Sequence, residues 1–166
     1  MGDSSGGHTA AVAAFTGNEK EFNIGEHLEE RTDVKACCLF YAPNDLLNLV
    51  QDRIDEGKRL RPDEGEYPFE AWEIFQEDFY DNAKELLYHA SPINYIKTAT
   101  NRPPVLFLNG DDDPIIPMKQ GIRFCNKVRE CGGTAEFVKI AGAGHGKGCW
   151  GKESIGLVKQ FFDLYL

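Results

Sequence analysis

The sequence predicts an α/β protein in which about three parallel strands are flanked by helices. Two short apolar runs, "VKACCLFYAP" and "PPVLFLNG", show no polar alternation, as is typical of strands that are buried on both faces. A third run, "TAEFVKI", alternates and therefore belongs nearer an edge of the sheet. Segments with helical spacing separate and follow these runs, and this alternation favours a parallel sheet.

Length and composition limit the class of protein. With 166 residues, 42% hydrophobic and 27% charged, the chain is one domain or a fragment of one. The net charge of −9 argues against binding to nucleic acid or to an anionic membrane. No apolar run approaches the roughly 20 residues that a membrane span needs. The five cysteines lack the spacing of a metal site, so we expect reduced thiols and a cytoplasmic protein.

The first third of the chain contains a helix, a loop and a strand. Residues 5–15 are rich in alanine and glycine, which predicts a helix that packs closely on a sheet. Residues 16–31 are polar and contain two glycines, as expected of a loop with a short helix. The apolar run at 34–41 is the first predicted strand. Asp45 follows it in "APNDLL", where we expect it to cap the next helix.

Residues 48–90 read as a cap-like helical insertion within a single domain over residues 1–166. Between residues 51 and 85 there are twelve acidic and five basic residues, so most of the net charge lies here. Phe69, Trp72, Phe75 and Phe79 have helix-compatible spacing. This aromatic stripe has two interpretations, ordinary helix packing or a wall of a substrate pocket that includes Trp72 and Phe75.

The last third supplies two more strands and two helices. Prolines introduce the strand "PPVLFLNG", and a glycine ends it. Residues 117–131 form a predicted amphipathic helix with Met118, Ile122, Cys125 and Val128 on one side. After the edge strand, residues 152–166 form a closing helix.

The stretch "GDSSG" at residues 2–6 fits the nucleophile-elbow pattern G-x-S-x-G. A nucleophile on a sharp turn between a strand and a helix needs a strained backbone, and we expect Gly2 and Gly6 to leave room for it. The hydroxyl of Ser4 would then project at a helix N-terminus. The backbone N–H of Ser5 is a natural donor to an oxyanion there.

A serine nucleophile needs a histidine base that a carboxylate orients, and the chain offers both in the order serine, acid, histidine. The acids of "NGDDDPIIP", Asp111 to Asp113, follow a buried strand, and His145 lies in the glycine-rich "GAGHGKG". His8 fits better as a residue of the helix start or of the pocket floor than as a base. The "DDD" run does not fit a calcium loop, and "GAGHGKG" does not fit a phosphate loop, so no metal or cofactor is expected.

Several motifs in order resemble the C-terminal part of an α/β-hydrolase fold serine esterase. They are "GDSSGGHTAAVAA", "VKACCLFYAPNDLL", "ASPINYI", "PPVLFLNGDDDPIIP" and "GAGHGKG". The resemblance is to carboxylesterases near the acetyl-esterase and feruloyl-esterase-like branch. It implies Ser4 as nucleophile, Asp113 as acid and His145 as base, with Asp113 preferred over Asp111 and Asp112 because it directly precedes "PIIP".

The resemblance implies hydrolysis of short-chain carboxylic esters through an acyl-enzyme, without a cofactor. The expected partner is a small-molecule ester, with an acylated carbohydrate among the candidates. Two alternatives are a serine peptidase similar to prolyl oligopeptidase and an inactive hydrolase fragment.

Members of this family have about eight strands, and the elbow follows the fifth. We therefore expect that the N-terminal half of the sheet, the strand leading into Ser4 and a loop that supplies a second oxyanion donor are absent. The strand at 34–41 would then be an exposed apolar edge that promotes self-association, and the chain alone would be nearly inactive.

Overall fold

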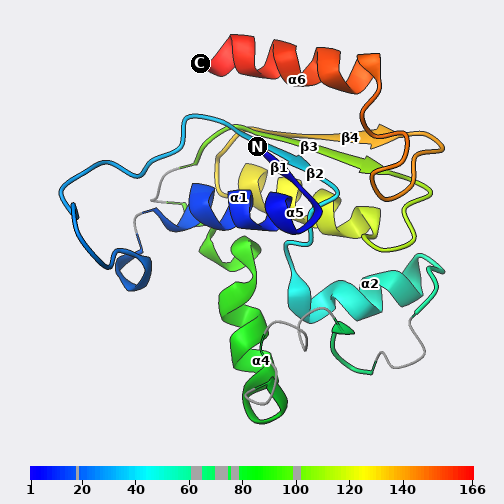
Figure 1. Ribbon diagram of the computed structural model, residues 1–166, viewed down its shortest axis with the longest axis horizontal. Helices are drawn as coiled ribbons and strands as arrows, with labels where there is room; N and C mark the ends of the chain where they lie inside the picture. Colours follow the sequence, from blue (N-terminus) through cyan, green and yellow to red (C-terminus); the bar gives the residue numbers. More distant parts are fainter. Residues whose placement is uncertain (18, 61–64, 70–74, 76–78, 99–101) are drawn as a thin grey trace.

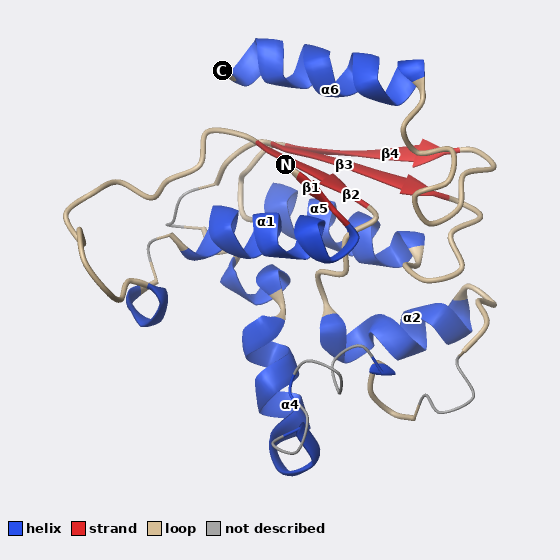
Figure 2. Cartoon of the chain, viewed as in Figure 1, coloured by secondary structure: helices blue, strands red, loops and turns tan. Residues whose placement is uncertain are grey.

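The computed structural model describes the whole chain except residues 18, 61–64, 70–74, 76–78 and 99–101. A parallel sheet lies between two layers of helices (Figures 1 and 2). On one face lie α1 (Ser4–Thr16) and α5 (Met118–Glu130), and on the other lies α6 (Lys152–Tyr165). This arrangement confirms the predicted α/β class with flanking helices.

The sheet has four parallel strands in the order of the chain. They are β1 (Gly2–Asp3), β2 (Cys37–Phe40), β3 (Val105–Gly110) and β4 (Ala135–Ile140). The expectation that no strand leads into Ser4 is wrong, because Gly2 and Asp3 pair with Leu39 and Phe40. β2 therefore has a neighbour on each side, and β1 and β4 are the edges of the described sheet. Self-association through an edge stays a prediction.

Side chains of the central strands alternate between the two faces. Cys37 and Leu39 belong to the core cluster that also contains residues of α1 and α5. Cys38 and Phe40 belong to the cluster against which α6 packs. All six residues of β3 are buried, whereas none of the six in β4 is fully buried. The continuous apolar runs and the alternating run thus correspond to central and edge strands, as predicted.

The buried face of α5 matches the predicted stripe in part. Cys125 and Val128 are buried as predicted, but Ile122 is 40% exposed. Gln120, Gly121 and Phe124 complete the buried face. A Cβ atom on Gly121 would come within 2.7 Å of the rings of Phe107 and Phe137, so this glycine lets the helix approach the sheet closely. Spacing alone did not identify this face because a buried polar residue and a glycine occupy it.

The segment expected to form a cap-like insertion contains α2 (Leu49–Asp55) and α4 (Phe79–Ala90). α4 extends away from the sheet, below α1 in Figure 1. Trp72 lies outside the described residues. Phe75 is partly buried and packs against the cluster that includes Leu46 and Leu49. The division at residues 48–90 stays a prediction.

All five cysteines are free, and all are buried. Burial raises the pKa of the Cys37, Cys38 and Cys125 thiols to about 12, so these thiols stay protonated near neutral pH. Cytoplasmic location stays a prediction. Within the described part of the chain, no helix is both long enough and apolar enough to cross a bilayer.

Candidate active site

Ser4 lies on the sharp turn between β1 and α1. Its φ of 48° falls in the left-handed region, which a residue with a side chain rarely adopts. Such strain is typical of functional sites, where the surrounding structure holds the residue in place. The turn directs the chain back over the sheet as α1 (Figure 1), so Ser4 stands at the carboxyl edge of the strands and at a helix N-terminus.

The glycines that this turn requires are Gly2 and Gly7. A Cβ atom on Gly2 would collide with the carbonyl oxygen of Gly6. One on Gly7 would lie 2.7 Å from the Cβ of Ala42 and 3.3 Å from the carbonyl oxygen of Phe40. At Gly6 the nearest atom would be 3.9 Å away, an ordinary contact. The expectation that a glycine is needed at position 6 to leave room for the strained turn is therefore wrong, whereas that for Gly2 is confirmed.

Three residues that are far apart in the sequence form a chain of hydrogen bonds. Nε2 of His145 lies 2.9 Å from Oγ of Ser4, and Nδ1 of His145 lies 2.9 Å from Oδ2 of Asp113. A carboxylate can only accept, so Nδ1 carries the proton and donates to Asp113. Nε2 then has a free lone pair, which accepts the hydroxyl proton of Ser4.

Asp113 is fully buried, and its second oxygen is also occupied. Oδ1 accepts hydrogen bonds from the backbone N–H groups of Ile115 and Ile116, at 2.8 and 2.9 Å. The two acids before it in the sequence, Asp111 and Asp112, do not bond to His145 in the described structure. Asp111 accepts the N–H of Gly142 at 2.7 Å, and this bond, above all, lowers the pKa of Asp111. Asp112 is exposed. Of the three acids, the structure brings Asp113 to the histidine.

An apolar pocket opens beside Ser4 and Ser5. Its volume is about 130 Å³. Other residues that line it are His8, Pro43, Leu46, Leu49, Arg53, Pro68, Ile115 and Ile116. Phe75 is not among these described lining residues, and its expected contact with substrate stays a prediction. The buried Arg53 donates from Nε to the carbonyl oxygen of Ile115 at 2.8 Å and so joins α2 to the wall that follows Asp113.

His8 fixes the end of α4 beside this pocket. Its Nε2 donates to the carbonyl oxygen of Ala90 at 2.6 Å, across 82 residues of sequence. Burial lowers the pKa of His8 below its ordinary value of 6.5, and the bond to Ala90 opposes this shift only in part. The imidazole of His8 is neutral and joins α1 to α4. This agrees with the prediction that His8 belongs to the pocket and is not the base.

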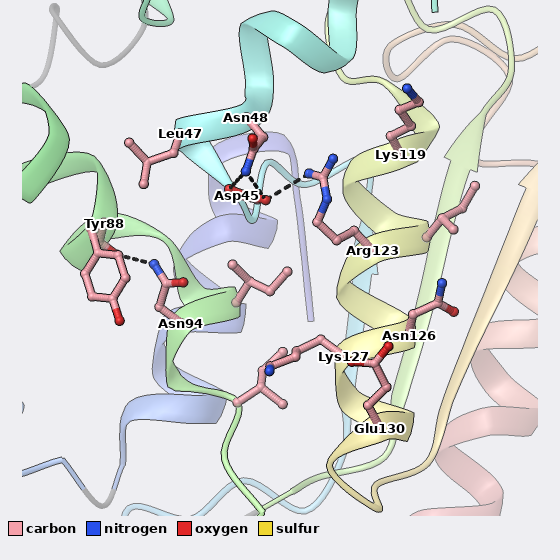
Figure 3. A pocket seen from close by; sticks show the side chains of 13 residues that line it. Asp45, Leu47, Asn48, Tyr88, Asn94, Lys119, Arg123, Asn126, Lys127 and Glu130 are labelled. Atoms are coloured by element: carbon pink, nitrogen blue, oxygen red, sulfur yellow. Dashed lines mark hydrogen bonds and ion pairs between the residues drawn. The ribbon is translucent and has the colours of Figure 1, made fainter. Parts of the chain in front are cut away.

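A buried polar cluster joins the start of α2 to α5 (Figure 3). Arg123 donates to Asp45 at 2.9 Å and to both oxygens of Asp52, at 2.6 and 2.8 Å. Gln120 accepts from the N–H groups of Asn44 and Asp45 and donates to Asp52. The expectation that Asp45 caps the next helix is wrong, because its carboxylate makes no capping bond there and accepts from Arg123 and Asn48 instead.

The same cluster borders a second hollow of about 770 Å³, away from Ser4, between α5 and the segments around Asn48 and Asn94 (Figure 3). By joining α2 to α5, the cluster holds Leu46 and Leu49 where they line the pocket beside Ser4. No group of three or more histidine, cysteine or acidic side chains able to hold a metal ion occurs among the described residues.

The structure adds two residues that the sequence did not single out. The ring of Tyr41 stands edge-on to the ring of His145, with centroids 4.7 Å apart. Tyr41 donates to Oδ2 of Asp3 at 2.9 Å and accepts from Nε1 of Trp150 at 3.0 Å. Tyr41 is the last residue of the run predicted as a strand, and it directly follows the observed β2, just as Ser4 directly follows β1. That position is the signal that could have identified it.

A comparison with known protein families shows to which family the chain belongs. The BD-FAE family matches residues 1–128. The chain belongs to the BD-FAE family. Two esterases of Mycobacterium tuberculosis, LipC and LipQ, are 27% and 29% identical over 146 and 145 residues, or 87% of this chain in each case. The chain spans 33% and 31% of their lengths, about a third of these curated relatives.

Solved structures of esterases show the same fold. A truncated form of a carbohydrate esterase from gut microbiota is 26% identical, with a TM-score of 0.78 over 99% of this chain and 57% of that one. The butyrate-bound Est2 esterase of Thermogutta terrifontis, at 20% identity, has a TM-score of 0.64 over 98% of this chain and 54% of that one. The family match and these similarities confirm the α/β-hydrolase esterase resemblance and the expectation that the chain matches only part of such proteins.

Proposed function

We propose that this BD-FAE chain carries the catalytic residues of a serine hydrolase that cleaves carboxylic esters. The observation that supports it most directly is the pair of 2.9 Å bonds that link Ser4, His145 and Asp113, with Ser4 on a strained turn. The names of the relatives favour esters over peptides as substrates. The proposal uses no cofactor.

In this mechanism the lone pair on Nε2 of His145 takes the proton of Ser4 as Oγ attacks the acyl carbon. Asp113 keeps the proton on Nδ1 and stabilises the imidazolium that forms. The imidazolium then protonates the leaving alcohol, and an acyl-enzyme remains on Ser4. Water, activated by the same nitrogen, releases the acid. His145 and the N–H groups of Ile115 and Ile116 all donate to Asp113 and hold its carboxylate in this position.

Ser5 supplies a donor to the oxyanion through its backbone N–H. Ser5 is the second residue of α1, so this N–H lies in the first turn and has no partner within the helix. The partial positive charge of the helix N-terminus adds to it. A donor of this kind contributes on the order of 10²–10³ in rate.

The pocket beside Ser4 fits a short acyl chain. Its volume of about 130 Å³ is well below the roughly 300–1,000 Å³ of sites for drug-sized ligands. Its floor and walls are mostly aliphatic, as suits an acetyl to butyryl group. We propose a carbohydrate as the alcohol part of the substrate, which makes the substrate an acylated carbohydrate, on the ground that one structural relative is a carbohydrate esterase.

A matched pair of serine variants tests the assignment. Ser4 and Ser5 are adjacent and both line the pocket, so Ser4→Ala and Ser5→Ala make similar changes in size and polarity. The sequence led us to expect a nearly inactive chain, but the assembled bonds among Ser4, His145 and Asp113 lead us to expect that a fluorophosphonate probe labels the unsubstituted chain on Ser4, located by peptide mass spectrometry. Ser5→Ala should keep the labelling because it retains the backbone N–H, and Ser4→Ala should abolish it.

Hydrolysis of p-nitrophenyl acetate provides the second measurement, with p-nitrophenyl octanoate as the long-chain comparison. Faster turnover of the acetate supports the short acyl pocket. Labelling on another residue, or labelling that survives in Ser4→Ala, would refute the catalytic assignment. A folded chain that neither reacts with the probe nor hydrolyses either ester would instead support the alternative of an inactive fragment.

A further inference from the structure

Each of the four strands delivers one side chain to the same site. Ser4 follows β1, Asp113 follows β3 and His145 follows β4, at the carboxyl edge of the sheet. The remaining strand, β2, ends at Phe40 and is followed directly by Tyr41. Tyr41 is buried, 2% exposed, although it carries a polar hydroxyl. Its backbone φ of 34° is, like that of Ser4, in the left-handed region.

We infer that Tyr41 and Trp150 are positioning residues that hold His145 against Ser4, an inference that rests on the proposed function for its catalytic consequence. Neither Tyr41 nor Trp150 takes part in making or breaking bonds of the substrate. Their role is to fix the loop that carries the base and to join it to the turn that carries the nucleophile.

The loop that carries His145 must span a long distance to bring the imidazole to Ser4. Ser4 and His145 follow the two edge strands of the described sheet, which are three strand spacings apart, or about 14 Å. The loop after β4 must therefore cross back over the ends of β3 and β2. Its positive-φ glycines, Gly142, Gly146 and Gly148, permit the turns but favour no single conformation.

Three interactions hold the two ends of this loop. At its start, the N–H of Gly142 donates to Asp111 at 2.7 Å. At its end, the ring of Trp150 stacks on Phe40, with centroids 4.2 Å apart and an interplanar angle of 19°. Nε1 of the same indole donates to Oη of Tyr41 at 3.0 Å. Trp150 thereby attaches the end of the loop to the end of β2.

Tyr41 extends this attachment to the nucleophile. Its hydroxyl donates to Oδ2 of Asp3, the residue directly before Ser4, at 2.9 Å. Its ring packs against the imidazole of His145 at 4.7 Å. One side chain thus contacts the residue before the nucleophile, the base and the end of the base's loop. Burial above all, with the bond to Asp3, raises the pKa of Tyr41 to about 12, so its hydroxyl remains a donor over the working range of an esterase.

The test compares Tyr41→Phe with Tyr95→Phe. Both tyrosines are buried, 2% and 5% exposed, and each hydroxyl donates a hydrogen bond of 2.9 Å, Tyr95 to the carbonyl oxygen of His89. Each variant removes one donated hydrogen bond, but Tyr41→Phe also removes the acceptor for Nε1 of Trp150, and of these two tyrosines it is Tyr41 that contacts His145. Trp150→Phe is the third variant, because it removes the indole N–H and leaves an aromatic ring to stack on Phe40.

The first readout needs no catalytic activity. The Nδ1–H proton of His145, observed by NMR, should exchange with water faster in Tyr41→Phe and Trp150→Phe than in the unsubstituted chain. It should be unchanged in Tyr95→Phe. The second readout is the rate of fluorophosphonate labelling at Ser4 and kcat for p-nitrophenyl acetate. We expect both to fall about 3- to 10-fold in Tyr41→Phe, the scale of one lost hydrogen bond, with KM little changed.

Unchanged exchange at His145 in Tyr41→Phe and Trp150→Phe would overturn the inference, and so would an equal loss of activity in Tyr95→Phe. If exchange accelerates as expected but no variant or parent chain reacts at Ser4, the positioning stands and the proposed esterase function fails. The two hypotheses are therefore tested separately.

Discussion

Substituting Gly6 and Gly7 one at a time should have opposite effects on stability. Alanine at Gly7 places a methyl group 2.7 Å from the Cβ of Ala42, where carbon atoms normally stay about 3.5–4.0 Å apart. Overpacking of this kind costs about 1–3 kcal/mol, and the better helix propensity of alanine offsets at most about 1 kcal/mol. We therefore expect Gly7→Ala to lower the free energy of unfolding by about 1–2 kcal/mol.

Alanine at Gly6 meets only Oδ1 of Asp3, at 3.9 Å. With no clash to offset it, the helix-propensity term should raise the free energy of unfolding by about 0.5–1 kcal/mol. The two variants should thus differ by about 2 kcal/mol, although both add one methyl group to adjacent positions of α1.

Urea unfolding followed by circular dichroism measures this difference. With a slope of about 2 kcal/mol per M urea, the two midpoints should be about 1 M apart. Labelling at Ser4 by a fluorophosphonate should persist in Gly6→Ala. If Gly6→Ala destabilises the chain as much as Gly7→Ala does, the close approach of α1 to β2 is not what requires glycine, and the reasoning fails.

Two other predictions concern charged groups. Burial lowers the pKa of His8, so the unfolded chain binds a proton at this histidine more readily than the folded chain does. The free energy of unfolding should therefore fall as the pH drops below about 6.5. Urea unfolding at pH 7.5 and at pH 5.5 should show a smaller loss of stability between the two pH values in His8→Gln than in the unsubstituted chain. Equal pH dependence in both chains would contradict this. Arg123→Met leaves Asp45 and Asp52 buried without their cation and should lower the free energy of unfolding by about 2 kcal/mol, a value reduced because Arg123 is 36% exposed. Lys159→Met breaks the exposed ion pair with Asp163 and should change the urea midpoint little. Equal effects of these two substitutions would show that the buried cluster adds nothing to stability.

The central strands and the residues of the candidate site were predictable because each has a local signal. A run such as "VLFLNG" has no polar alternation, Ser4 lies in the G-x-S-x-G pattern, and Asp113 and His145 each follow a predicted strand. The sequence did not predict β1, because a strand of two residues is too short to show the alternation of side chains. Its pairing with Leu39 and Phe40 depends on the whole sheet and leaves no trace in the local sequence.

Residues that act through distant contacts were less predictable. Gln120 is buried because its amide satisfies backbone groups 75 residues away, so its polarity suggested the opposite face of α5. Asp45 resembled a capping residue because the sequence does not show Arg123 beside it. Tyr41 looked like one more apolar residue of a strand, since neither its hydrogen bonds nor its contact with His145 has a sequence pattern.

The strand order has a consequence for how the site comes into being. Because the strands are added to the sheet in the order of synthesis, a chain emerging from the ribosome can dock each unit on the one before it. In the proposed mechanism the nucleophile, Ser4, is made before the base, His145, which follows 141 residues later. Until β4 has docked and its loop has crossed the sheet, Ser4 lacks its hydrogen bond to His145 and would, in that mechanism, be an ordinary alcohol. Reactivity toward esters would thus be the last property that the nascent chain acquires.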